Sequence, residues 1–389
     1  MRRRYPRGVA VLALLGLLAA ACSPGGSPAQ ADVEVADWEA VTAAAEGQTV
    51  RWWMFGGDDR VNTYVDEHVS AAAAAHGVTI ERVPISDTVD AVRRVTAERQ
   101  AGRNPGSVDL IWINGHNFAA GKEAGLWLEA WARRLPNTAL VDWDDETIAL
   151  DFGVPVDGQE SPWTRGAFVF AHDPQRLPDP PTTFGELLAW ARDNPGRFTY
   201  PAPPDFTGSA FVRQVVQALG EDEAFALLAE LRAHQWRAGA AFPGSEAELS
   251  QLFGDGQVDL AMSYDPTFVE TGVLQGTFAP EVRPFVLDHG TLQNTSYVTI
   301  PANAANVEGA LVVADLLLDP SLQALLEDPE IWGMPTVLDV ERLAPDEQAL
   351  FDQRRGGDHV LDDLGELVPE LSAERVEELD RRWRDEVLR

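Results

Sequence analysis

Several side chains that could bind a small molecule lie where predicted strands end. Aromatic rings there could stack on a flat or cationic ligand, and Asp58 or Asp265 could supply the opposite charge. Arg165 and the predicted helix start at residues 207–209 instead favour a carboxylate or phosphate, because guanidinium groups and helix N-termini attract anions. A ligand with both a cationic ring and an anionic group would satisfy both sets. The candidate ligand-binding residues are Phe55, Gly56, Asp58, Trp112, Asn114, Trp163, Arg165, Tyr200, Asp205, Thr207, Ser209, Tyr264, Asp265, Asn294 and Tyr297.

Some of these candidates also have a purely structural explanation. Tryptophans such as Trp112 and Trp163 are usually core residues, and the binding interpretation depends on several aromatic residues falling at strand ends together. Asp205 is expected to cap the helix that follows it.

Residue patterns typical of catalysis or metal binding are absent from the sequence. The Gly-x-Ser-x-Gly motif of hydrolases does not occur, since Ser209 lies in TGSAF and Ser245 in PGSEA. Asp58 and Asp59 are neighbours whose side chains diverge, which makes a poor acid and base pair. The acidic residues between 142 and 146 lack the glycine of a calcium loop, and the seven histidines show no paired metal spacing. We therefore expect no enzyme activity, no metal site and no cofactor.

The elements that must position the candidates alternate between strands and helices. Strands are predicted at residues 49–55, 78–85 and 108–113, and the first two are followed by helical patterns. Such units imply a parallel sheet with helices on both faces, whose loops after Phe55 and Ile113 lie along one edge. Further strands are predicted at 197–200, 258–262 and 292–300, and further helices at 207–217, 222–234, 245–253 and 307–318.

The helix that opens at residues 207–209 follows a proline loop, and its apolar positions from Phe211 onward recur at helical spacing. This leaves its polar first turn available for a ligand. Another helix is predicted to begin at Pro320, with Asp319 as its cap.

Length and composition limit the class of protein. A chain of 389 residues that is 45% hydrophobic can bury a substantial core and is long enough for about two domains. Its net charge of −32 argues against a nucleic-acid partner. The single cysteine, Cys22, allows no internal disulfide.

The amino terminus has the layout of an export signal over residues 1–21, with arginines before an apolar run that is too short to span a bilayer permanently. Small residues directly before Cys22 resemble a lipobox, the motif at which bacterial lipoproteins are cleaved and lipidated. Residues 22–47 are expected to form the lipidated cysteine and a flexible tether, because 23–32 are rich in Ser, Gly, Pro and Ala.

Four sequence stretches carry a resemblance to a known family. The sequence resembles the solute-binding lipoproteins of bacterial ABC importers, in the branch grouped with thiamine, polyamine and iron binders. Besides the lipobox, the matching stretches are DLIWINGHNF (109–118), the stretch NPGRFTYPAPPDFTGSAFVRQ that begins at Asn194, GDGQVDLAMSYDP (254–266) and IPANAANVEGALVVADLLLDPSLQ (300–323).

The resemblance implies an α/β, two-lobed type II periplasmic-binding-protein fold. Each lobe would be a mostly parallel sheet flanked by helices, and a two-strand hinge would join them. The first lobe would comprise residues 48–157, the second 158–290, and 291–389 would return to the first lobe with C-terminal helices.

The function implied by the resemblance is that of an extracytoplasmic solute receptor. Such a receptor would bind a small polar or cationic nutrient, thiamine-like or polyamine-like, in the cleft between its lobes and deliver it to the ABC permease. It would be a monomer held to the outer face of the cytoplasmic membrane by lipid on Cys22. The alternatives are a secreted lipoprotein hydrolase and a structural lipoprotein without a transport role.

Overall fold

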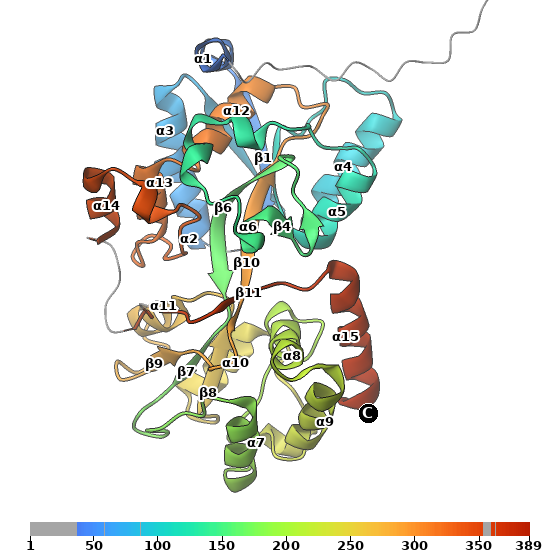
Figure 1. Cartoon of the computed structure of the whole chain (residues 1–389), viewed down its shortest axis with the longest axis vertical. Helices are drawn as coiled ribbons and strands as arrows, with labels where there is room; N and C mark the ends of the chain where they lie inside the picture. The colour runs from blue at the N-terminus through green and yellow to red at the C-terminus, as the bar shows by residue number, and fades with distance from the viewer. Residues whose placement is uncertain (1–36, 58, 86, 353–358, 362) are drawn as a thin grey trace, which may run out of the picture. The chain divides into compact units, whose positions relative to one another are not determined.

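The computed structural model describes residues 37–57, 59–85, 87–352, 359–361 and 363–389 (Figure 1). The predicted export signal, Cys22 and Asp58 lie outside these residues. All of these described residues belong to one compact unit.

The larger sheet has six strands in the described part of the chain, in the order β11-β10-β3-β1-β2 with β6 also paired to β10. Strand β1 pairs in parallel with β2 and β3, whereas β10 is antiparallel to both β3 and β6. The strands are β1 (Thr49–Phe55), β2 (Thr79–Ile85), β3 (Leu110–Ile113), β6 (Glu160–Ala167), β10 (Thr291–Thr299) and β11 (Leu367–Pro369).

Helices cover both faces of this sheet (Figure 1). Val50, Trp52 and Met54 alternate along β1 and are fully buried on the face that packs against α12 (Val307–Leu316). The other face packs against α4 (Val89–Gln100) and α5 (Gly115–Glu123), through a second group of apolar residues. The predicted strands at 49–55, 78–85 and 108–113 are therefore present, within two residues at their ends.

The smaller sheet consists of β7 (Val169–His172), β8 (Leu260–Ser263) and β9 (Arg283–Phe285), in the order β8-β7-β9. Both of its pairings are antiparallel. The predicted α/β fold class is confirmed, but the expectation of a mostly parallel second sheet was wrong. The helices around it are α7 (Phe184–Asp193), α8 (Phe206–Leu219), α9 (Glu221–Arg232), α10 (Glu246–Gly254) and α11 (Phe268–Leu274).

Residues 197–200, predicted as a strand, are irregular in the structure. Their carbonyl groups accept hydrogen bonds from separate segments, at Phe198 from the Trp236 N–H (2.8 Å) and at Arg197 from the Asp259 N–H (2.8 Å). Apolar packing rather than sheet pairing holds the segment, because Phe198 and Tyr200 are both fully buried.

Strands β6 and β10 connect two separate hydrophobic cores. Trp163 and Val298 belong to the core of the larger sheet, whereas Phe168 and Leu292 belong to the core of the smaller sheet. The two strands pair along their length, from Gln293 opposite Ala167 to Thr299 opposite Glu160. This two-stranded ribbon corresponds to the two strands predicted to join the lobes.

Both ends of the described chain depart from the expected boundaries. Trp38–Ala45, expected within a flexible tether, form α1, which packs on α12 because Val41 and Ala45 are buried. Helix α15 (Ala373–Glu386), expected in the first lobe, packs against α8 and α9 (Figure 1). Its apolar residues Leu379 and Trp383 are spaced four apart and join the core of the smaller sheet.

The remaining elements connect these layers. Asp319 caps α13 (Pro320–Leu326), whose first residue is Pro320, as predicted. Among the described residues no single helix is long and apolar enough to cross a membrane. The bent pair α12 and α13 reaches the length and apolar composition of a membrane span only when the two helices are counted together. The elements are α2 (Asp59–Thr63), a π-helical turn (Tyr64–Val69), α3 (Ser70–Ala75), α6 (Glu146–Ala149), β4 (Leu150–Asp151), β5 (Val154–Pro155), α13 (Pro320–Leu326) and α14 (Pro345–Asp352).

A buried ion pair fastens the C-terminal segment to α8. The Arg213 guanidinium donates two hydrogen bonds of 2.7 Å to the Glu370 carboxylate, and both side chains are almost fully buried. The Tyr264 hydroxyl also donates to Glu370 (2.8 Å).

We expect Glu370→Ala to destabilise the protein by about 3–5 kcal/mol, because it leaves the Arg213 charge buried without its partner. Urea unfolding measures the change. The matched control is Glu230→Ala, which breaks an ion pair with Arg192 at the surface and should cost no more than about 1 kcal/mol. Equal effects of the two substitutions would contradict the buried pairing.

Candidate functional site

A cavity of about 750 Å³ lies where strand ends from both sheets meet. Phe55, Asn114 and Tyr264 stand at or just after the carboxyl ends of β1, β3 and β8. Open α/β sheets commonly bind ligands at the carboxyl ends of their strands. The lining residues are Phe55, Arg60, Val61, Asp87, Thr88, Trp112, Ile113, Asn114, Asn117, Thr164, Gly166, Phe206, Glu246, Ser263, Tyr264, Asp265, Asn294, Ser296, Trp332 and Met334.

Aromatic rings form much of the cavity wall. Trp112 and Trp332 pack on the fully buried Trp163 behind them, with ring centroids 5.0 and 5.2 Å away. Phe55 and Phe206 are 43% and 49% exposed, although large apolar side chains are seldom left open to solvent in this structure. Exposed apolar surface inside a concave site is typical of a place where a ligand binds.

Charged groups in the cavity include three carboxylates and one guanidinium. Arg60 of α2 pairs with Asp265 after β8 at 3.0 Å and also donates to the Thr271 hydroxyl at 2.7 Å. Asp265 further accepts hydrogen bonds from the backbone N–H and hydroxyl of Thr267. The Asp265 charge, predicted to face a ligand, is therefore largely used to join α2 to the loop after β8.

Glu246, the first residue of α10, is a carboxylate that the sequence did not single out. One oxygen accepts from the Ser263 hydroxyl at 2.6 Å, and the other accepts from the Thr207 hydroxyl. Burial raises the pKa of Glu246 to about 7, against the opposite effect of these two hydroxyl groups. No sequence signal marks the residue, because its position at the cavity depends on contacts with α8 and β8.

Six of the predicted site residues line the cavity: Phe55, Trp112, Asn114, Tyr264, Asp265 and Asn294. Gly56 lies in the turn beside Phe55, where its carbonyl accepts a hydrogen bond from the Asn62 amide (3.0 Å). Asp58 lies outside the described residues.

Arg165 and Tyr297 point away from the cavity. Side chains alternate between the faces of a strand, so Thr164 and Gly166 of β6 line the cavity while Arg165 is directed to the other side. There Arg165 pairs with Asp145 at 3.1 Å, and the Tyr297 hydroxyl donates to the Ile148 carbonyl at 2.9 Å. Neither of these two predicted site residues therefore lines the cavity.

The four candidates between 200 and 209 do not line the cavity either. Tyr200 is fully buried, 4.5 Å from the Phe211 ring centroid, and its hydroxyl accepts a 2.8 Å hydrogen bond from the Trp383 indole. Asp205 caps α8 by accepting from the Gly208 N–H at 3.0 Å. The other two donate hydrogen bonds to carboxylates of the protein. The Thr207 hydroxyl donates to Glu246, and the Ser209 hydroxyl donates to Asp380 at 2.6 Å. The helix start predicted to be free for a ligand is thus occupied by the protein itself.

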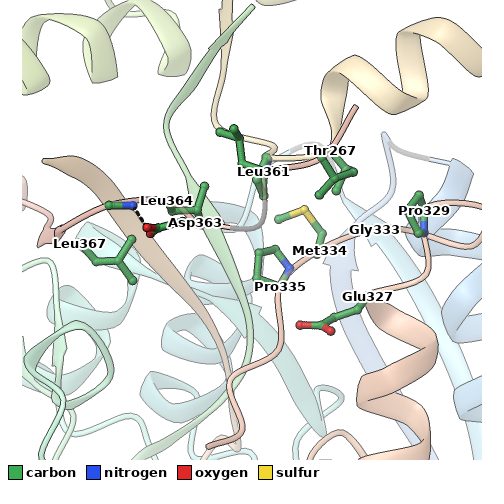
Figure 2. Close-up of a pocket in the computed structure, with 13 residues that line it drawn as sticks. Thr267, Glu327, Pro329, Gly333, Met334, Pro335, Leu361, Asp363, Leu364 and Leu367 are labelled. Carbon is green, nitrogen blue, oxygen red and sulfur yellow. Dashed lines mark hydrogen bonds between the residues drawn. The ribbon is translucent and has the colours of Figure 1, made fainter. Parts of the chain in front are cut away.

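Figure 2 shows the residues that line a second cavity, of about 490 Å³. Met334 lines both cavities. The lining side chains of the second cavity are mainly proline, leucine and methionine, with no aromatic ring. The Asp363 carboxylate already accepts a hydrogen bond from the Gly365 N–H (2.8 Å). The first cavity is the better candidate site, because only it combines strand ends, aromatic walls and several polar groups. Across the described residues no group of three or more His, Cys, Asp or Glu side chains is arranged to hold a metal ion.

Comparison with known proteins gives consistent matches over most of the chain. A family model described as bacterial extracellular solute-binding protein matches residues 67–346. Protein YnjB of Escherichia coli (strain K12) is 36% identical over 366 residues, which cover 89% of this chain and 93% of YnjB.

Solved structures share the fold at low sequence identity. An extracellular solute-binding protein from Bordetella parapertussis has a TM-score of 0.66 at 13% identity, covering 87% of this chain and 98% of that one. A periplasmic thiamin-binding protein has a TM-score of 0.59 at 17% identity, covering 88% and 96% of the two chains.

The burial of Tyr200 can be tested with Tyr200→Phe. We expect this substitution to cost about 1–3 kcal/mol in unfolding free energy, because the Trp383 indole N–H loses its acceptor. The control is Thr199→Val, since the buried Thr199 hydroxyl has no hydrogen-bond partner among the described residues and its loss should cost little. Thermal unfolding of both variants measures the difference, and a Tyr200→Phe protein as stable as the wild type would contradict this packing.

Proposed function

We propose that this chain, which belongs to the bacterial extracellular solute-binding proteins, is the receptor of an ABC importer and takes up a small cationic nutrient in the 750 Å³ cavity. Extracellular solute-binding proteins of such importers bind small molecules outside the cytoplasm and deliver them to the permease. What is proposed beyond the family is the place and the chemistry of the bound solute.

The observation that carries the proposal is the combination of aromatic walls and acidic groups in one cavity. Asp87, Glu246 and Asp265 contribute carboxyl groups, and Arg60, the cationic side chain of the lining, is paired with Asp265. Aromatic faces attract cations through their quadrupole, most strongly where water is excluded. The cavity therefore suits a cation better than an anion.

Closure around the solute would use two features of the structure. The β6–β10 ribbon links the two cores, so bending there would change the width of the cavity. The Arg60–Asp265 ion pair joins α2 to the loop after β8 and would favour the closed state. Ligand contacts to both sides would add to this preference.

Two kinds of nutrient fit the proposal. A thiamine-like ligand would place a flat cationic ring between the aromatic walls, and a thiamin-binding protein shares this fold. A polyamine-like ligand would place its charged nitrogens beside the carboxylates. We further propose that the receptor is monomeric and held at the membrane by lipid on Cys22.

Native mass spectrometry of the gently purified protein tests the proposal directly, followed by identification of any released compound. Thermal shift assays with thiamine, spermidine, neutral sugars and anionic metabolites supply the comparison. We expect cations to raise the melting temperature. A protein that retains no compound and responds to none of the panel would count against the receptor function.

Phe206→Ala should weaken binding of the cation that gives the largest shift by about 3- to 30-fold, because an aromatic face at the cavity is lost. Calorimetry measures the change. Stability should hardly alter, since Phe206 is 49% exposed. The control is Leu274→Ala, another exposed apolar residue, which does not line the cavity. Equal affinities of wild type and Phe206→Ala would place the ligand elsewhere.

A further inference from the structure

Two of the carboxylates in the cavity, Asp265 and Glu246, are held in different ways. Asp265 is engaged by Arg60 and Thr267, as described above. Each oxygen of Glu246 instead accepts one hydroxyl hydrogen bond, from Ser263 or Thr207, and no ion pair with Glu246 occurs among the described residues. These hydroxyl groups fix the orientation of the carboxylate without neutralising its charge.

A carboxylate can accept about four hydrogen bonds, so the two hydroxyl groups leave acceptor capacity at the cavity wall. Burial makes this unused capacity costly, and the nearby Asp265 and Asp205 add negative potential at Glu246. A positively charged group that also donates hydrogen bonds would both fill the unused acceptor positions and offset the negative potential.

Resting on the proposed receptor function, we propose that Glu246 is the specificity-determining residue, and that the group it binds is a cation with N–H donors. Ammonium and guanidinium groups meet this requirement. A quaternary ammonium would gain from the aromatic walls but would leave the acceptors of Glu246 unused. The site should therefore prefer an N–H-bearing cation over a quaternary one of similar size.

Binding should also release a proton. Because burial raises the pKa of Glu246 to about 7, part of the carboxyl population carries a proton near neutral pH in the absence of ligand. A bound cation stabilises the ionised form and lowers the pKa, so affinity should rise with pH and level off above it. The charged groups that act on Glu246 are Asp205, the cap of α8, and Asp265 after β8, which is itself paired with Arg60 of α2. Glu248, on the same helix as Glu246, instead accepts a hydrogen bond from the Gly244 N–H.

The experiment measures binding of spermidine, agmatine, choline and glycine betaine by calorimetry at pH 6, 7 and 8. The amine and guanidinium groups of agmatine stay charged over this range. For wild type we expect spermidine or agmatine to bind more tightly than either quaternary compound, with affinity about tenfold higher at pH 8 than at pH 6.

Glu246→Gln keeps the size of the side chain but removes its charge and titration. We expect it to weaken binding of the N–H-bearing cation by about 10- to 100-fold and to abolish the pH dependence. The control is Glu248→Gln on the same helix, because Glu248 is exposed, accepts from the Gly244 N–H and does not line the cavity. It should leave both affinity and pH dependence unchanged.

Failure of this inference can be distinguished from failure of the receptor function. Unchanged affinity in Glu246→Gln, tighter binding of choline or betaine, or no pH dependence in wild type would each overturn the role of Glu246 while the protein still binds a solute. A wild type that binds only neutral or anionic solutes would overturn the role of Glu246 and the cationic class. A wild type that binds no solute in any assay would overturn the receptor function itself. If Glu246→Gln does not fold, the pH dependence of the wild type alone decides the question.

Discussion

The antiparallel pairing of β6 with β10 is the constraint on which the candidate site depends. β6 starts in the core of the larger sheet and leads directly into Phe168 of the other core, while β10 runs the opposite way between the two cores. This single ribbon therefore fixes where the strand ends of the two sheets meet. The alternation of side chains along the ribbon then decides what the cavity contains. Thr164, Asn294 and Ser296 line it, while Arg165 faces Asp145 on the opposite side.

Two carboxylates at the cavity show how neighbours change the role of one chemical group. Asp265 and Glu246 both line it, but Asp265 has a guanidinium 3.0 Å away, whereas Glu246 has only hydroxyl partners among the described residues. The first arrangement holds segments of the protein together, and the second leaves charge to be balanced by something else. Asp265 has the residue type and the strand-end position expected of a ligand-binding aspartate. Its ion pair with Arg60 is what gives it a structural role instead.

Much of the larger sheet could be predicted from the sequence, because its strands and helices show clear periodicity and carry their own caps and turns. Phe55, Trp112 and Asn114 were found at the cavity for the same reason, since parallel strands place their carboxyl ends at one edge. The core position of Tyr200 could not be predicted, because an aromatic residue beside a proline loop fits a core and a cavity wall equally well. Trp383, which holds Tyr200 in the core, lies 183 residues further along. Glu246 was missed because it reaches the cavity only when α10 packs against the end of β8, a contact that no local pattern specifies.

The position of helix α15 has a consequence for how the protein is made. Its Leu379 and Trp383 complete the core of the smaller sheet, whose other members begin near residue 168. The larger sheet likewise needs β10 and β11, which come late in the chain. Neither core can therefore be complete before these late segments have been synthesised, and until then the earlier strands and helices keep part of their apolar surface uncovered.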